Sequence, residues 1–166
     1  MPIAICGVSE VPAFATIPLD HIISIREIHQ PAPDIQGFKT DFTLHSFVFC
    51  DTGDPTHPLA VSEKQIGRLI NIYAQTNVNQ NMLFHCFAGV SRSSAAAFIW
   101  LAYHGMPYAK AYQTIVSGRG QFVCPNQLMI KLADQLMDRG GEMAAFMSAE
   151  IGRRAPEREA YFAAHR

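Results

Sequence analysis

Short apolar runs separated by polar turns fill the first half of the chain. They lie at residues 3–6, 21–25, 42–50 and 81–86, and Pro, Gly and Asp punctuate the segments between them. Runs of this length and composition, bounded by turn residues, are typical of β-strands. We therefore predict a strand at each of these positions.

A helix is predicted between the last two of these strands. Ser62 and Gln65 form a capping-box pattern. After them, apolar residues recur at helical spacing, at positions 66, 69, 70 and 73. A strand, a helix and a further strand in succession favour parallel pairing of the two strands.

The second half of the chain shows helical spacing instead. Residues 92–104 are apolar on nearly every side, which suits a helix buried at the centre of the domain. Gly105 and Pro107 mark the end of this helix and the start of the next one. That next helix has one amphipathic face, over residues 108–116.

Further helices are expected toward the C-terminus. Leucines at helical spacing predict one over residues 128–136, and two short helices are expected at about 142–151 and 155–164. The sequence thus predicts the α/β class, with a central, mostly parallel sheet of about four to five strands flanked by helices. We expect one domain over residues 1–166, with a helical C-terminal half.

Composition and charge exclude several classes of function. The chain is 49% hydrophobic and 16% charged, which is ample for a continuous core. Its 13 Lys and Arg residues nearly balance 14 Asp and Glu residues, and no basic block could follow a nucleic-acid backbone. The N-terminal apolar run has no basic residues ahead of it, and no apolar stretch is long enough to span a membrane. We expect a cytoplasmic protein that neither binds nucleic acid nor inserts into a membrane.

The cysteines and histidines give no sign of a metal or a cofactor. Cys6, Cys50, Cys86 and Cys124 are scattered without a C-x-x-C pair, which disfavours a zinc site and a disulfide framework. The histidines at positions 21, 45 and 57 do not group with carboxylates at metal-ligand spacing. We expect reduced thiols, no metal and no cofactor.

The stretch HCFAGVSRSS at residues 85–94 carries the strongest chemical signal. Cys86 closes a predicted strand, Arg92 opens a predicted helix, and Gly89 lets the loop between them curl tightly. Successive N–H groups in such a loop form a nest, and the N-terminus of the following helix adds partial positive charge. The stretch therefore predicts a phosphate-sized anion site with a thiol at its floor.

Cys86 and Arg92 suit nucleophilic chemistry on a phosphoryl group. The field that holds an anion also favours the thiolate, which makes Cys86 a competent nucleophile. The planar guanidinium of Arg92 can hold two phosphoryl oxygens at once, a geometry that lysine cannot reproduce. The alternative is that Cys86 is a buried structural thiol and Arg92 a solvated residue at a helix start.

HCFAGVSRS resembles the H-C-x5-R-S/T signature of the cysteine-dependent protein tyrosine phosphatases, in a form similar to their dual-specificity branch. From about residue 20 to 135, the strand, capped helix, signature loop (residues 85–93), central helix and later helix with Pro125 and Asn126 follow the family's order. The sequences of the segments HCFAGVSRS and PNQLMIKLAD are similar to those of small bacterial members of the family.

The resemblance implies a phosphatase-like fold and a phosphocysteine intermediate on Cys86. It also implies that Ser93 stabilises the thiolate as it leaves during hydrolysis, and that His85 supports the loop and tunes the thiolate. A simple packed histidine is the alternative for His85. Phosphate binding is implied for the arginine and for the amides along the loop, which belong to Phe87, Ala88, Gly89, Val90, Ser91 and Arg92.

The serines around the helix start allow a separate expectation. We expect the Ser91 and Ser94 hydroxyls to bond to nearby backbone, as serine commonly does at helix starts.

Cleavage of a phosphate ester also requires a proton for the leaving oxygen, which the family takes from an aspartate after another strand. Asp51 directly follows the apolar run at 42–50, and we favour it for that reason. Asp54 is the alternative general acid, because its spacing from the signature loop is closer to the family's. Either aspartate could instead be an ordinary turn residue.

The signature loop also bears on substrates. Its variable positions carry no lysine, which argues against polyphosphorylated inositol lipids, and no long aromatic substrate-recognition loop is recognisable. We expect a shallow cleft that accepts phosphotyrosine, and also phosphoserine and phosphothreonine, on a protein or a small phosphomonoester. Oxyanions such as phosphate, sulfate and vanadate should bind the loop.

Two other classes of function compete with a phosphatase. One is a catalytically idle phosphate-binding module, and the other is a sulfurtransferase or arsenate reductase. The serine after Arg92 and the nearby aspartates favour the phosphatase. Cys50 could form a reversible disulfide with Cys86 after oxidation, or simply be a half-buried strand residue.

Overall fold

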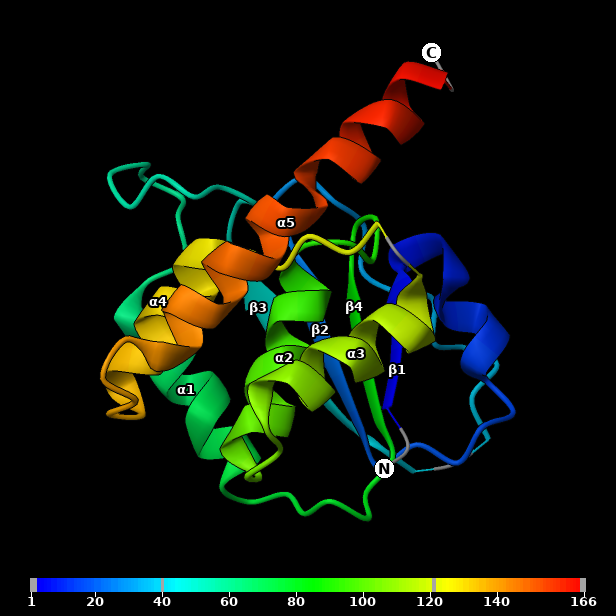
Figure 1. The fold of residues 1–166 in the computed structure, drawn as a ribbon. Coiled ribbons are helices and arrows are strands. Elements are labelled where there is room, and N and C mark those ends of the chain that lie inside the picture. Colours follow the sequence, from blue (N-terminus) through cyan, green and yellow to red (C-terminus); the bar gives the residue numbers. More distant parts are fainter. Residues whose placement is uncertain (1–2, 40, 121, 165–166) are drawn as a thin grey trace.

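A sheet of four parallel strands forms the centre of the computed structural model, which describes residues 3–39, 41–120 and 122–164. The strands pair in the order β1-β4-β2-β3, and the helices lie around them (Figure 1). The predicted α/β class with a parallel sheet is confirmed. The strands are β1 (Ile3–Gly7), β2 (His21–Arg26), β3 (Thr43–Val48) and β4 (Met82–Cys86).

The helices follow the predicted order along the chain. The capped helix between β3 and β4 is present, with the Ser62 side chain accepting from Gln65 N and the Gln65 side chain accepting from Ser62 N. A short 3-10 helix, η1, follows β1. The helices are η1 (Val8–Phe14), α1 (Glu63–Tyr73), α2 (Arg92–Tyr103), α3 (Tyr108–Arg119), α4 (Gln127–Leu136) and α5 (Glu142–Ala164).

The expectation of two short helices near the C-terminus is wrong. A single helix, α5, runs from Glu142 to Ala164 and contains Pro156. Proline cannot donate to the carbonyl four residues before it, here that of Gly152. Gly152 is exposed, so water can satisfy that carbonyl and the helix continues; Figure 1 shows the C-terminal end of α5 projecting beyond the rest of the fold.

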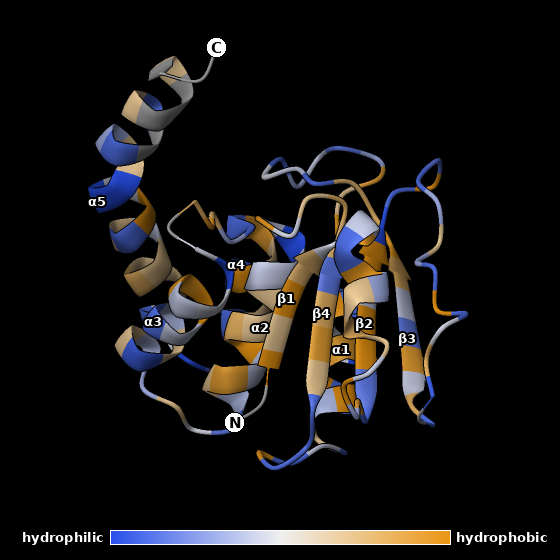
Figure 2. Ribbon diagram, turned by 90° about the vertical axis from the view of Figure 1, so that its right-hand side faces the viewer, coloured by the Kyte–Doolittle hydropathy of each residue, from blue (hydrophilic) through white to orange (hydrophobic). Residues whose placement is uncertain are grey.

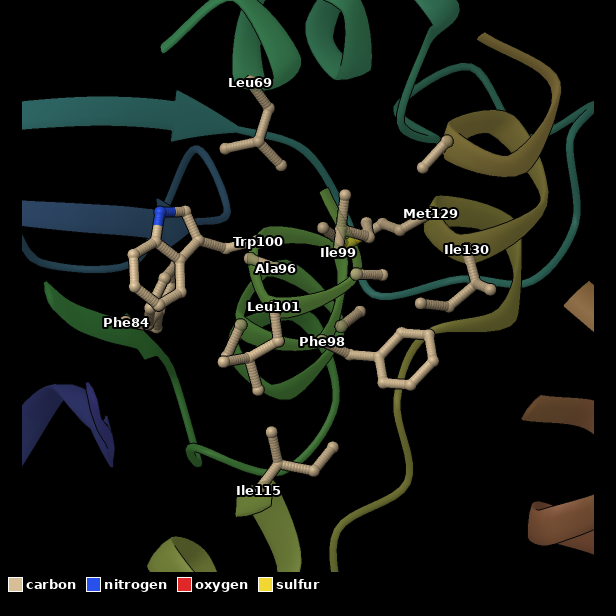
Figure 3. Close-up of a cluster of buried hydrophobic side chains, with 14 of the residues drawn as sticks. Leu69, Phe84, Ala96, Phe98, Ile99, Trp100, Leu101, Ile115, Met129 and Ile130 are labelled. Carbon is tan, nitrogen blue, oxygen red and sulfur yellow. The ribbon is translucent and has the colours of Figure 1, made fainter. Parts of the chain in front are cut away.

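Helix α2 packs at the centre of the core, as its continuous apolar sequence predicted. Its residues from Arg92 to Ala102 are all buried. Figure 3 shows Phe84 of β4, Leu69 of α1 and Ile115 of α3 around this helix, with Met129 and Ile130 of α4 on another side. A separate buried cluster, on the face of the sheet toward η1, contains Cys6, Val11, Leu19, Ile22 and Leu83.

The strands differ in how deeply they are buried. Figure 2 shows mostly hydrophobic residues along β1, β4 and β2, and more polar ones along β3, which is the edge strand. Because all strands run in the same direction, their carboxyl ends meet at one edge of the sheet, where open α/β folds usually bind ligands. Among the described residues, none of the helices combines the length and the apolar content that crossing a bilayer requires.

Candidate active site

The signature loop connects the carboxyl end of β4 to the N-terminus of α2. Gly89 adopts a left-handed backbone conformation with φ +73°. A Cβ atom at this position would lie 2.5 Å from the backbone carbon of Cys6 and 2.6 Å from the nitrogen of Gly7. Only glycine therefore fits here, both because of its φ and because β1 lies so close.

Donors from outside the signature loop occupy the carbonyl oxygens of residues 87–91. The carbonyls of Ala88 and Gly89 accept from the Arg119 guanidinium, at 2.8 and 3.1 Å. Since the C=O and N–H of a trans peptide point in opposite directions, this arrangement turns the amides of residues 88–92 toward the inside of the loop. The other carbonyls accept from backbone amides: Phe87 from Val8 (3.0 Å), Val90 from Cys124 (3.0 Å) and Ser91 from Asn126 (3.3 Å).

Cys86 lies at the floor of this loop and is almost completely buried. Its Sγ accepts a hydrogen bond from the Gly89 amide at 3.3 Å and lies 3.2 Å from the Ser93 Oγ. The N-terminus of α2 begins a few residues further on and adds its partial positive charge. These groups stabilise negative charge on the sulfur and on any oxyanion that lies above it.

Arg92 is buried and fixed at both ends of its guanidinium. One terminal nitrogen donates to the Phe49 carbonyl at 2.9 Å, and the other forms an ion pair with Glu27 at 3.3 Å. Its Nε has no hydrogen-bond partner among the described residues, and the nearest carboxylate oxygen, Oδ2 of Asp51, is 3.8 Å away. A buried cation with an unused donor at the end of the loop that Cys86 opens is a suitable partner for an anion.

The two candidate acids lie in different surroundings. Asp51 Oδ1 accepts from the Ser91 Oγ at 2.7 Å and from the Asn126 Nδ2 at 2.8 Å, which places this carboxyl beside the signature loop. Asp54 lies in a fully exposed turn, where its Oδ1 accepts from the amide and hydroxyl of Thr56. These hydrogen bonds lower the pKa of Asp54. The structure thus brings Asp51, and not Asp54, into contact with residues of the signature loop.

His85 and Cys6 lie side by side on β4 and β1 beneath the loop. Burial lowers the pKa of His85 to about 4, and a polar interaction with the Cys86 backbone opposes this only in part. The imidazole is therefore neutral near pH 7. Burial, with a smaller contribution from Glu10, raises the pKa of the Cys6 thiol to about 12, so this second cysteine is an inert thiol.

The serines at the helix start behave differently from one another. Ser94 Oγ donates to the backbone carbonyls of Val90 and Ser91, as expected. The same expectation is wrong for Ser91, whose hydroxyl donates to the Asp51 carboxylate, 40 positions earlier in the chain. This partner could not be foreseen, because the contact depends on how β3 pairs in the sheet.

Three contacts of the site were missed from the sequence. Glu27 lies two residues after the end of the predicted strand at 21–25, so its place at the carboxyl edge of the sheet was a usable signal. Asn126 was noted only for its place in the later helix, whereas its amide binds the Asp51 carboxylate and the Thr52 carbonyl. Arg119 gave no signal, since its partners in the signature loop lie 30 and 31 residues away and Glu10 lies 109 residues away.

The other cysteines and histidines bear on disulfide and metal chemistry. Among the described residues, none of the four cysteines forms a disulfide, and Cys50 and Cys124 are partly buried. His21 and His45 contact each other at 3.2 Å on β2 and β3. Within the part of the chain that the structure describes, no group of three or more His, Cys, Asp or Glu residues is placed to hold a metal ion.

Comparison with known proteins identifies the fold. No protein-family model and no curated protein sequence matches the chain. Among solved structures, human DUSP28 is similar with a TM-score of 0.59 and 20% identity, over 82% of this chain and 94% of that one. A mouse putative dual specificity phosphatase, solved as a complex with zinc tungstate, gives a TM-score of 0.59 and 17% identity over 83% of both chains.

A third similar structure is the human tyrosine phosphatase-like serine/threonine/tyrosine-interacting protein. Its TM-score is 0.57 and its identity 19%, over 81% of this chain and 86% of that one. At these identities the similarity establishes the fold. The chain therefore has the fold of the dual-specificity phosphatases, and the phosphatase-like fold expected from the sequence is confirmed.

Proposed function

We propose that this protein is a cysteine-dependent phosphatase, formed by one domain over residues 1–166, that hydrolyses phosphomonoesters through a phosphocysteine on Cys86. One observation carries the proposal. The buried Cys86 thiol lies beneath a loop of inward-facing amides, and this loop leads to the buried Arg92, whose Nε has no hydrogen-bond partner among the described residues. A phosphoryl group fits these donors by size, charge and hydrogen-bonding capacity.

The reaction proceeds in two steps. The Cys86 thiolate attacks phosphorus, the bond between phosphorus and the ester oxygen breaks, and Asp51 gives its proton to that oxygen. Water then attacks the phosphocysteine, Asp51 takes the proton of the water, and the sulfur leaves as a thiolate. Arg92 and the loop amides stabilise the equatorial oxygens in both steps, and the Ser93 hydroxyl donates to the departing sulfur.

The contacts of Asp51 support its role as the general acid. Ser91 and Asn126 both donate to Oδ1, so Oδ2 is the oxygen through which the proposed mechanism transfers the proton. The interaction of these donors with one oxygen also fixes the orientation of the carboxyl. In the proposed mechanism Asp54 takes no part, since its carboxylate binds Thr56 of its own exposed turn, whereas that of Asp51 binds Ser91 of the signature loop.

The rim of the site supports phosphotyrosine as the preferred substrate, ahead of phosphoserine and phosphothreonine. Ile28, Leu59 and Phe87 belong to the loops after β2, β3 and β4, at the carboxyl edge of the sheet where β4 ends in Cys86. They are large hydrophobic residues with exposed fractions of 59%, 48% and 55%. An aromatic leaving group would cover apolar surface on such a rim. Positions 87–91 carry no lysine for a second phosphate.

Oxyanions are part of the proposal. Phosphate, sulfate and vanadate should occupy the loop and compete with substrate. The mouse phosphatase was solved as a complex with zinc tungstate, and tungstate is a tetrahedral oxyanion of the same class, which supports this expectation. Membership of the small bacterial group rests only on the sequences of the HCFAGVSRS and PNQLMIKLAD segments and stays a prediction.

A second candidate is a catalytically idle phosphate-binding module. The similarity to the human phosphatase-like interacting protein keeps this candidate open, whereas the presence of Cys86, Arg92 and Asp51 in one site favours the enzyme.

Hydrolysis of p-nitrophenyl phosphate by the wild-type chain and by Cys86→Ser separates the candidates. We expect turnover in the wild type that is lost in the variant. Phosphate binding without turnover in the wild type would favour the idle module. Appreciable turnover by Cys86→Ser would refute the phosphocysteine mechanism.

A further inference from the structure

Arg119, the last residue of α3, contacts the outer side of the signature loop. Its Nε donates to the Gly89 carbonyl at 3.1 Å and a terminal nitrogen donates to the Ala88 carbonyl at 2.8 Å. The same guanidinium pairs with both carboxylate oxygens of Glu10, each at 2.9 Å. Glu10 in turn accepts from the Gly7 amide, so the arginine joins α3, the loop and the end of β1.

The charge of this pair is maintained near neutral pH. Partial burial alone raises the pKa of Glu10, but hydrogen bonds from Arg119 and Gly7 outweigh that effect and lower it. The carboxylate therefore stays ionised and holds the guanidinium in one orientation. That orientation presents two donors to two successive carbonyls, which matches the planar fork of arginine.

The two peptides that Arg119 holds are those whose amides face the reaction. The Ala88 carbonyl shares its peptide with the Gly89 amide, which donates to the Cys86 sulfur. The Gly89 carbonyl shares its peptide with the Val90 amide. Since the two ends of a peptide point in opposite directions, fixing each carbonyl outward fixes each amide inward.

Both of these peptides are bonded to Gly89. Glycine tolerates backbone conformations that other residues avoid, so rotation around Gly89 has a small steric cost. The neighbouring carbonyls of Phe87 and Val90 are held by backbone amides, which a side-chain substitution does not remove. The Ala88 and Gly89 carbonyls accept instead from a side chain, that of Arg119, which a substitution can remove.

We propose that Arg119 is a positioning residue that keeps the Gly89 and Val90 amides directed at Cys86 and at the bound oxyanion. The effect of Arg119 on catalysis rests on the proposed phosphatase function. The effect of Arg119 on anion binding is independent of that function.

The test compares Arg119→Ala and Arg119→Lys with the wild type. Three quantities are measured. They are the affinity for orthovanadate, by calorimetry; the rate at which iodoacetamide alkylates Cys86 at mildly acidic pH; and kcat and KM for p-nitrophenyl phosphate. Removing hydrogen bonds from a charged donor should weaken vanadate binding about tenfold and slow alkylation several-fold. The loss in hydrolysis should fall mainly on kcat, because the amides stabilise the transition state.

Lysine and a remote arginine serve as controls. Arg119→Lys can keep the ion pair with Glu10 and so the thermal stability, but it cannot bind both carbonyls and should recover only part of the vanadate affinity. Arg153→Ala removes an exposed arginine of α5 that pairs with Glu150 and should change none of the readouts.

Each outcome decides the inference. Wild-type vanadate affinity and alkylation rate in Arg119→Ala, or complete recovery by lysine, would overturn it. If the alanine variant does not fold, the lysine variant still tests the two-carbonyl contact. If the wild type binds vanadate but hydrolyses nothing, the proposed function fails while the affinity comparison still decides the role of Arg119.

Discussion

Two loops contact each other through Ser91 and Asp51, and they are held in different ways. The signature loop is fixed by backbone donors, by Arg119 and by the close approach of β1 at Gly89. The acid loop, residues 51–60, is mostly exposed, and side chains hold Asp51 at its start. The first arrangement suits charge stabilisation, which requires donors fixed in advance. The second suits a group that delivers a proton and then lets product leave.

Glycine substitutions should break this comparison most strongly. An alanine Cβ at Gly89 would meet the backbone of β1 at 2.5 Å, in a φ region that side chains rarely adopt. A Cβ at Gly53 in the acid loop would meet nothing within 4 Å. We expect Gly89→Ala to lower kcat/KM on p-nitrophenyl phosphate about a thousandfold or more, since the nest cannot form, and Gly53→Ala to change it little.

Circular dichroism and thermal unfolding of both glycine variants provide the control for folding. Comparable activity in the two variants would show that the signature loop does not require the left-handed conformation at Gly89.

Arg92→Lys tests the fixed loop without removing its charge. Lysine keeps the positive charge near Glu27 but loses the fork that can bind an oxyanion while contacting the Phe49 carbonyl. We expect kcat to fall about a hundredfold or more with a preserved fold. Arg68→Lys on α1 is the matched control. Near wild-type kinetics for Arg92→Lys would contradict the proposed clamp.

Asp51→Asn tests the acid loop. Only a poor leaving group needs a proton in the transition state, so this change should slow phenyl phosphate about a hundredfold and an activated ester much less. The basic limb of the rate-pH profile should disappear as well. Asp54→Asn should have little effect, because that carboxylate only supports its own turn.

The reverse pattern for the two aspartates would transfer the acid role to Asp54. If neither variant distinguishes leaving groups, the acid loop holds no general acid, and the idle phosphate-binding module becomes the better candidate.

Local spacing predicted much of the fold. The capped helix after Ser62, the strand before Cys86 and the fully buried helix after Arg92 follow from hydrophobic periodicity and cap residues, which act over a few positions. The continuity of α5 through Pro156 was missed because it depends on exposure of the helix, which local sequence does not encode.

Some residues of the candidate site were likewise predictable from local sequence, whereas others depend on the tertiary structure. Cys86, Gly89 and Arg92 are close together in the sequence, and one motif identified them. Glu27 and Arg119 contact the loop across long separations that only strand pairing and helix packing establish. Both aspartates follow the same strand, so spacing left them as alternatives; the side-chain contacts of Asp51 distinguish them.

The pH dependence of stability should also separate the two loops. His85 lies buried below the signature loop, with its pKa lowered to about 4, whereas the unfolded chain titrates near the ordinary value. The unfolded state therefore binds more protons between those values, and stability falls as the pH falls through that window. The loss for this residue approaches about 3 kcal/mol at the acid end.

His85→Asn should flatten this dependence when urea unfolding is measured at neutral pH and near the acid end of the window. Three partly buried histidines, His21, His45 and His104, also have lowered pKa values and leave some slope in the variant. His57→Asn, in the exposed acid loop, is the control and should keep the wild-type slope. An unchanged slope in His85→Asn would show that His85 does not remain neutral in the folded protein.

The smallest expected effects concern the rim, where each loop contributes an exposed hydrophobic residue. Phe87 extends from the fixed signature loop and Leu59 from the acid loop, with exposed fractions of 55% and 48%. If an aryl leaving group packs on the ring of Phe87, burying about 40 Å² of apolar surface stabilises binding by about 1 kcal/mol. Phe87→Ala should then raise KM for phosphotyrosine about fivefold. Its effect on kcat and on a small alkyl phosphate should be slight.

Leu59→Ala should give a smaller rise in KM, because less area is removed and because the acid loop is less firmly fixed around it. Val78→Ala, before β4 and therefore at the opposite edge of the sheet, provides the control for loss of an exposed hydrophobic side chain. An equal rise in KM for aryl and alkyl phosphates in Phe87→Ala would mean that the residue maintains the shape of the loop. A rise confined to aryl phosphates would mean that the fixed loop, besides binding the phosphoryl group, contributes the surface that recognises the leaving group.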